Sequence, residues 1–168
     1  MDHDEMKQEF LAVYDQYADD IFRYCVLKVS GRTVAEDLTQ EVFMRYWQQL
    51  RKGTSIVNGR ALLYAMARNL IIDWYRRKKE QSLEVLTEEG YQFPSNDEGT
   101  IEQHAQLREV LDVIKDLDET SREALTLRFV EGFSPKEIAA LSGESANAVS
   151  VRINRALKKV QDHLHTHD

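Results

Sequence analysis

Ala35-Glu-Asp-Leu-Thr-Gln-Glu-Val-Phe-Met-Arg-Tyr-Trp47 is the stretch of this sequence that decides the fold. At about 100° per residue, its apolar side chains gather on one half of a helix. That half holds Leu38, Val42, Phe43, Tyr46, Trp47 and, one turn further on, Leu50. The opposite half holds Asp37, Gln40, Glu41, Met44 and Gln48, and no lysine. Because a merely soluble helix face usually mixes both charge signs, this half is typical of a surface that binds a partner.

Length and composition are those of a helical globular protein. The 168 residues are 42 % hydrophobic and 30 % charged, which suits one ordinary domain or two small ones. Two prolines and seven glycines, with few runs of β-branched residues, predict an all-α fold. The single Cys25 excludes an internal disulfide, and no apolar run is long enough to span a membrane. We therefore expect a cytoplasmic protein without membrane insertion.

Charge is unevenly distributed along the chain. The formal net charge of −7 disfavours strong DNA binding, because phosphates are neutralised by Lys and Arg. Two short tracts, residues 76–79 and 152–159, are nevertheless basic. We expect such a chain to bind DNA weakly alone and better within a larger assembly.

Periodicity divides the chain into two domains and a linker. Residues 1–80 carry helical periods over 6–28, 33–51 and 59–79, the second of which a Thr33–Glu36 capping box would open. Residues 81–100 are acidic, include glycine and proline, and lack a sustained period, which predicts a linker. Residues 101–168 form a second helical domain, with another predicted capping box at Thr120 and Glu123.

The end of the second domain has a helix-turn-helix pattern. Ser134-Pro-Lys-Glu137 places Ser at the N-cap, Pro at N1 and Glu at N3 of a short helix. Gly143 marks the turn that follows, and a longer helix spans residues 145–164. A short capped helix, a glycine-bearing turn and a longer helix are typical of DNA-binding proteins, although many helical hairpins imitate this pattern.

The last helix carries side chains suited to reading DNA. Opposite its apolar stripe lie Asn147, Val151, Asn154, Arg155 and Lys158, with Ser150, Arg152 and Lys159 at the flanks. Amides and cations of this kind contact base edges and phosphates in a major groove. Val151 fits contact with a thymine methyl group, whereas the alternative is that lone surface valines are common.

The helix over residues 59–79 is predicted to turn a second set of such side chains away from its core. Tyr64, Arg68, Asn69, Tyr75, Arg76 and Lys79 interleave aromatic and basic character. Single-stranded DNA suits this arrangement because bases stack on rings while phosphates follow cations. The alternative is a solvated basic helix end that complements the helix dipole.

Three runs, in this order and spacing, resemble the extracytoplasmic-function (ECF, group 4) family of sigma-70 factors. Residues 37–43 resemble region 2.2, residues 67–77 resemble regions 2.3 to 2.4, and residues 117–164 resemble region 4. The resemblance implies two small helical domains, a region 2 bundle and a region 4 helix-turn-helix, joined by a linker. It also implies a subunit that directs core RNA polymerase to promoters and helps to melt DNA, with no cofactor and no enzymatic activity of its own.

Site residues and partners also follow from the resemblance. The β′ clamp helices of core RNA polymerase would contact Asp37, Gln40, Glu41, Met44 and Gln48, and the β subunit is a further implied partner. The minus-ten element of promoter DNA would contact Asn58, Tyr64, Arg68, Asn69, Tyr75, Arg76, Arg77 and Lys78. The minus-thirty-five element would contact Ser134, Lys136, Asn147, Ser150, Val151, Arg152, Asn154, Arg155 and Lys158. Because family members are often held by an anti-sigma factor, we expect one here as well.

Two other functions compete with this hypothesis. A stand-alone helix-turn-helix regulator would bind an operator as a dimer, and a helical adaptor would carry its basic stripes incidentally. The face around Asp37 and Glu41 discriminates, because a repressor does not require it. We expect no metal site at His163, His165 and His167, which lie at a fraying acidic end, and no catalytic role for Cys25.

Overall fold

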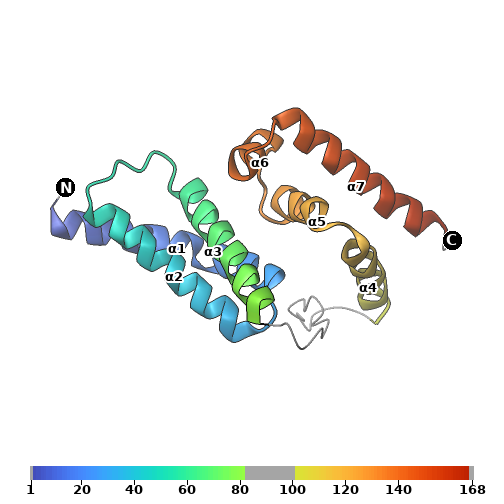
Figure 1. Ribbon diagram of the computed structural model, residues 1–168, viewed down its shortest axis with the longest axis horizontal. Helices are drawn as coiled ribbons and strands as arrows, with labels where there is room; N and C mark the ends of the chain where they lie inside the picture. The colour runs from blue at the N-terminus through green and yellow to red at the C-terminus, as the bar shows by residue number, and fades with distance from the viewer. Residues whose placement is uncertain (1, 82–100, 167–168) are drawn as a thin grey trace. The chain divides into compact units, whose positions relative to one another are not determined.

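The computed structural model describes residues 2–81 and 101–166, and every regular element within these ranges is a helix (Figure 1). The prediction of an all-α fold is therefore confirmed. The chain divides into two compact units, Met1–Pro94 and Ser95–Asp168. Apart from Gln81, the predicted linker lies outside the described residues.

The first unit is a three-helix bundle in which each helix contacts the other two. Its elements are α1 (His3–Lys28), α2 (Arg32–Arg51) and α3 (Gly59–Gln81). The largest fully buried side chains of the bundle are aromatic, Tyr24, Tyr46 and Tyr64, and Ile21, Val42 and Leu63 are fully buried as well. Burial of these rings supplies much of the apolar area that holds so small a unit together.

Close approach of two helices fixes the place where α3 begins. A Cβ atom on Gly59 would lie 3.0 Å from the hydroxyl oxygen of Tyr46 on α2. Asn58 precedes this glycine and caps the helix, because its Oδ1 accepts a hydrogen bond from the Ala61 N–H at 3.0 Å. The loop of residues 52–58 is thereby anchored at its C-terminal end.

The second unit contains α4 (Ile101–Asp116), α5 (Glu119–Leu125), α6 (Pro135–Ser142) and α7 (Ala146–Thr166). One π-helical turn, η1 (Thr126–Val130), extends α5 and leaves Phe129 and Val130 exposed. Helix α7 contacts α4, α5 and α6, and its buried side chains are Val149, Ile153 and Ala156. Helices α6 and α7 together form the predicted helix-turn-helix.

Local signals predicted some helix ends correctly and others wrongly. Ser134 and Glu137 form the predicted capping box of α6, and Gly143 ends that helix in the left-handed conformation with φ of 74°. By contrast, α2 begins at Arg32 after Gly31, which places Thr33 inside its first turn. Asp118, rather than Thr120, caps α5 by accepting from the Ser121 N–H at 3.1 Å.

Cys25 belongs to the core of the first unit, as the sequence predicts. Burial raises the pKa of its thiol to about 12, although a hydrogen bond with Thr39 works in the opposite direction. No described helix is both long and apolar enough to cross a membrane. Within residues 2–81 and 101–166, no three His, Cys, Asp or Glu side chains gather in a way that could hold a metal ion.

Candidate partner and nucleic-acid surfaces

The predicted partner-binding side chains share the outward face of α2. Asp37, Gln40 and Gln48 are exposed, and Met44 is 58 % exposed although it is apolar. Glu41 is half-buried, and its Oε1 lies 2.7 Å from Nε of Arg45 one turn further on. Arg45 was not predicted on this face, and the ion pair of Arg45 with Glu41 removes part of the negative charge expected there.

An apolar hollow of about 640 Å³ adjoins this face between α1 and α2. Gln40 and Met44 line it together with aromatic and aliphatic side chains of both helices, namely Phe10, Leu11, Tyr14, Phe43 and Trp47. Phe43 and Tyr14 pack edge to face with ring centroids 4.8 Å apart. The contribution of α1 could not be found from the α2 pattern alone, although Leu11 and Tyr14 are exposed apolar residues one turn apart.

On α3, only part of the predicted DNA-facing set lies on the surface. Asn69, Arg76 and Arg77 are exposed, while Arg68 is half-buried. Arg76 Nη1 lies 3.6 Å from the carboxylate of Asp73, a loose ion pair between exposed groups that costs little to break. In the preceding loop Val57 is almost fully exposed, and this apolar residue was not among those predicted to lie at the site.

The prediction that Tyr64 faces outward is wrong. Its side chain is 1 % exposed, and its ring centroid lies 5.3 Å from that of Tyr24 on α1. Ile71, two turns further along the same side of α3, is also buried. The buried arc is therefore displaced toward Tyr64, because α3 packs against both α1 and α2 rather than against one neighbour.

Tyr75 and Lys78 hold the end of α3 against the end of α1. The Tyr75 hydroxyl donates to the Lys28 carbonyl oxygen, and Lys78 Nζ lies 3.2 Å from the Ser30 hydroxyl. Lys78 also sits 5.0 Å from the ring centroid of Trp74. Both side chains are thus engaged inside the first unit, in addition to whatever they contact outside it.

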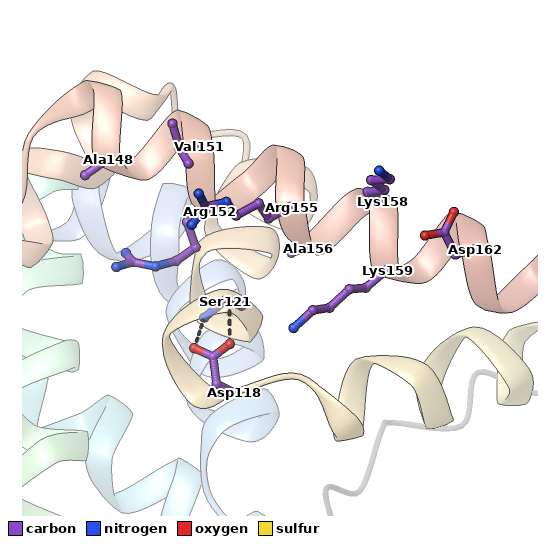
Figure 2. A pocket seen from close by; sticks show the side chains of 10 residues that line it. All are labelled: Asp118, Ser121, Ala148, Val151, Arg152, Arg155, Ala156, Lys158, Lys159 and Asp162. Atoms are coloured by element: carbon purple, nitrogen blue, oxygen red, sulfur yellow. Dashed lines mark hydrogen bonds between the residues drawn. The ribbon is translucent and has the colours of Figure 1, made fainter.

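On α7, the predicted DNA-facing set lies together on the surface. Asn147, Asn154, Arg155 and Lys158 are exposed, Ser150 is half-buried, and Val151 is 38 % exposed. Figure 2 shows Val151, Arg155 and Lys158 in succession along the helix. On α6, Lys136 is exposed, whereas the Ser134 hydroxyl caps its own helix by accepting from the Glu137 N–H at 3.1 Å.

A groove of about 710 Å³ runs between α7 and the start of α5 (Figure 2). Arg152, Arg155, Lys158 and Lys159 supply positive charge to its α7 wall, and Asp162 ends this basic run one turn later. On the other wall, hydrogen bonds from Ser121 lower the pKa of Asp118, with a smaller contribution from Lys159. The groove therefore continues the basic surface of α7 around the flank of the helix.

Arg152 differs from its basic neighbours because an acid engages it. Its Nη1 donates to Oε2 of Glu144, which lies in the turn between α6 and α7. This hydrogen bond is the main reason that the pKa of Arg152 is raised above its ordinary value. The two side chains are only 26 % and 28 % exposed, so this pair is shielded more than a typical surface ion pair.

The fold is therefore that of a two-unit helical protein, in which a helix-turn-helix with a basic second helix accompanies a three-helix bundle with a polar outward face on α2. Two family models match: sigma-70 region 2 over residues 13–81 and sigma-70 region 4 over residues 107–160. The chain belongs to the ECF family of RNA polymerase sigma factors, which confirms the sigma-factor prediction over the stand-alone regulator.

Relatives and solved structures agree with this assignment. The ECF RNA polymerase sigma factor BldN of Streptomyces coelicolor is 33 % identical over 89 % of this chain, which spans 58 % of the length of that relative. RNA polymerase sigma factor SigZ of Bacillus subtilis is 30 % identical over 89 % of this chain and 83 % of its own length. The sigma factor RpoE of Bartonella quintana, solved with the anti-sigma factor NepR, is 26 % identical, with a TM-score of 0.72 over 96 % of this chain and 97 % of that one.

Proposed function

We propose that this chain directs core RNA polymerase to specific promoters and helps to melt DNA, acting in the cytoplasm without enzymatic activity of its own. The observation that carries the proposal is the exposed face of α2, on which Asp37, Gln40 and Met44 lie beside an apolar hollow. A stand-alone regulator has no use for such a face. A sigma factor requires one, since the polymerase supplies the DNA affinity that a net charge of −7 denies the free chain.

The β′ clamp helices of the polymerase are the proposed occupant of the α2 face. Exposed ion pairs contribute at most about 1 kcal/mol each, so Asp37 and Glu41 alone would bind weakly. Burial of Met44 and of the neighbouring hollow adds an apolar contribution that grows with the area removed from water. Several weak polar contacts around an apolar centre are typical of a protein interface. The β subunit is a further proposed partner.

Promoter DNA is assigned to the two other surfaces. The loop of residues 52–58, with Arg68, Asn69, Arg76 and Arg77 of α3, would hold the minus-ten element. Unstacking each base costs a few kcal/mol, which contacts in a protein pocket offset. Helix α7 would read the minus-thirty-five element through Asn147, Val151, Asn154, Arg155 and Lys158, with Lys136 and Ser150 beside it. Exposure of all these α6 and α7 side chains except the half-buried Ser150 supports the assignment to α7.

An anti-sigma factor is the third proposed partner. The similar RpoE of Bartonella quintana was solved in complex with the anti-sigma factor NepR. An inhibitor that covers the α2 face would exclude the polymerase from it. We therefore expect the antagonist and the core enzyme to compete for this chain.

A gel-shift titration tests the proposed function. Promoter DNA is mixed with the chain alone, with core polymerase alone and with both, and only the mixture should give a specific shift. A regulator would shift DNA unaided and an adaptor would never do so, and either result contradicts the proposal.

The same titration with Asp37→Lys tests the α2 face. This variant should weaken core binding without unfolding the protein, because Asp37 is exposed. Asp19→Lys is the matched control: it makes the same charge change at an exposed position of α1 that does not line the hollow. Equal losses in both variants would indicate a general charge effect rather than a docking site.

A further inference from the structure

The turn between α6 and α7 holds one acid in a fixed place. Gly143 and Glu144 both donate their backbone N–H groups to the carbonyl oxygen of Ala139, at 2.9 and 3.2 Å. These bonds close the end of α6 and tie the backbone of Glu144 to that helix. The Glu144 side chain therefore starts from a backbone position that the turn has already set.

That carboxylate engages a guanidinium on α7. Arg152 lies on the wall of the groove that also holds Arg155 and Lys159, and its Nη1 donates to Glu144. Arg155 and Lys158 are exposed, whereas about three quarters of the Arg152 and Glu144 side chains is covered. A charge-assisted hydrogen bond between partly covered groups is stronger than one in open solvent.

We infer that Glu144 withholds Arg152 from DNA, so that Arg152 positions the reading helix and does not neutralise a phosphate. This inference rests on the proposed function, in which α7 lies against promoter DNA. A phosphate would have to displace a carboxylate that the turn has already placed, and it would approach that negative charge while doing so. Glu144 thus lowers the affinity for DNA of any sequence and leaves discrimination to the exposed side chains of α7.

Withholding one cation has a measurable signature in salt dependence. Log affinity falls as log salt concentration rises, and each phosphate that a protein neutralises makes this slope more negative by about 0.9. Release of Arg152 should therefore steepen the slope by about one and tighten binding to random duplex DNA about three- to tenfold at low salt. If Arg152 instead contacted a phosphate in the unmodified protein, removal of the Arg152 charge would make the slope less steep.

The experiment compares Glu144→Gln, Arg152→Gln and the double variant with the unmodified chain. Binding to random duplex DNA is measured for the full chain alone and for its complex with core polymerase, at several salt concentrations. We expect a steeper slope for Glu144→Gln, an unchanged slope for Arg152→Gln, and no steepening in the double variant. A slope that falls by about one in Arg152→Gln would overturn the inference.

Two further variants separate the inference from trivial causes. Asp162→Asn removes one negative charge from α7 without touching the Glu144–Arg152 pair, so it should not steepen the slope; an equal effect there would contradict us. Arg152→Lys keeps the charge on a flexible stem but lacks the guanidinium whose Nη1 donates to Glu144. It should therefore steepen the slope as Glu144→Gln does, and it tests the inference even where the Glu144→Gln protein fails to fold. If the unmodified chain fails to bind core polymerase, the proposed function is wrong, but the salt dependence of DNA binding by the free chain still tests the inference.

Discussion

Helices α3 and α7 were both predicted to carry DNA contacts, but the two helices differ in how many of the predicted side chains are exposed. On α7 the buried side chains form a narrow stripe, so the opposite side chains are exposed. On α3 the buried arc is wider and includes Tyr64, while Tyr75 and Lys78 contact the end of α1. The period of the sequence assigns the exposed face where the buried side chains form a narrow stripe, as they do on α7. It does not show how far a wide buried arc extends, as on α3.

Removal of the Tyr64 ring should give the largest effect. Tyr64→Ala is expected to lower the free energy of unfolding by about 3–5 kcal/mol, because it leaves a cavity beside Tyr24. Chemical denaturation of the full chain measures this loss, and Tyr64→Phe, which keeps the ring, serves as the control. A Tyr64→Ala protein of unchanged stability that no longer opened promoters would restore the DNA-binding role of this residue.

Truncation of Arg155 tests the other helix. Arg155→Ala should reduce promoter affinity by about 1–3 kcal/mol if the guanidinium makes a bidentate contact with a base, while stability stays the same. The matched control is Lys115→Ala, which removes a cation from α4. A similar loss on every DNA sequence, with a salt slope smaller by about one, would reassign Arg155 to a phosphate.

Loss of the Tyr75 hydroxyl should have a smaller effect, on stability alone. Tyr75→Phe removes the hydrogen bond to the Lys28 carbonyl and should cost about 0.5–1.5 kcal/mol of unfolding free energy. The ring remains, so stacking on a base would be unaffected. Thermal unfolding and an open-complex assay on the same preparation separate the two roles, and a defect confined to promoter opening would refute our assignment.

Val151 should give the smallest change in stability. Val151→Ser replaces an exposed side chain and should alter the free energy of unfolding by no more than about 0.5 kcal/mol. If the methyl groups contact a thymine, the variant should lose preference at one base pair of the promoter and nowhere else. Affinity measured over a set of single-substitution promoters decides this, and an unchanged preference everywhere would make Val151 an ordinary surface residue.

The same contrast explains what the sequence could and could not predict. The cap of α6 was predictable because Ser134, Pro135 and Glu137 all act within one turn. The start of α5 was not, since several polar residues within a few positions can each cap a helix, and Asp118 rather than Thr120 does so. The start of α2 was not predictable from a capping residue either, because α2 follows Gly31 and has no side-chain cap. The outward face of α2 was found from its period, apart from Arg45.

Contacts that join distant parts of the chain were invisible in the sequence. The bond from Tyr75 to Lys28 spans 47 positions, and no local pattern encodes it. The pair of Glu144 and Arg152 spans only eight positions, yet it depends on the angle that the turn imposes between two helices. A list of polar residues on a helix face therefore contains both those that meet a ligand and those that hold the fold.

Contact between Gly59 and Tyr46 has a practical consequence for redesigning promoter preference. Any side chain at position 59 would crowd the tyrosine hydroxyl, since a Cβ atom there would lie 3.0 Å from it, and the buried Tyr46 would have to shift by a few tenths of an ångström. A combinatorial library that diversifies residues 52–58 can alter the loop freely only if this glycine stays constant. A change at position 59 would also shift Tyr46, so its effect on promoter preference could not be ascribed to base recognition alone.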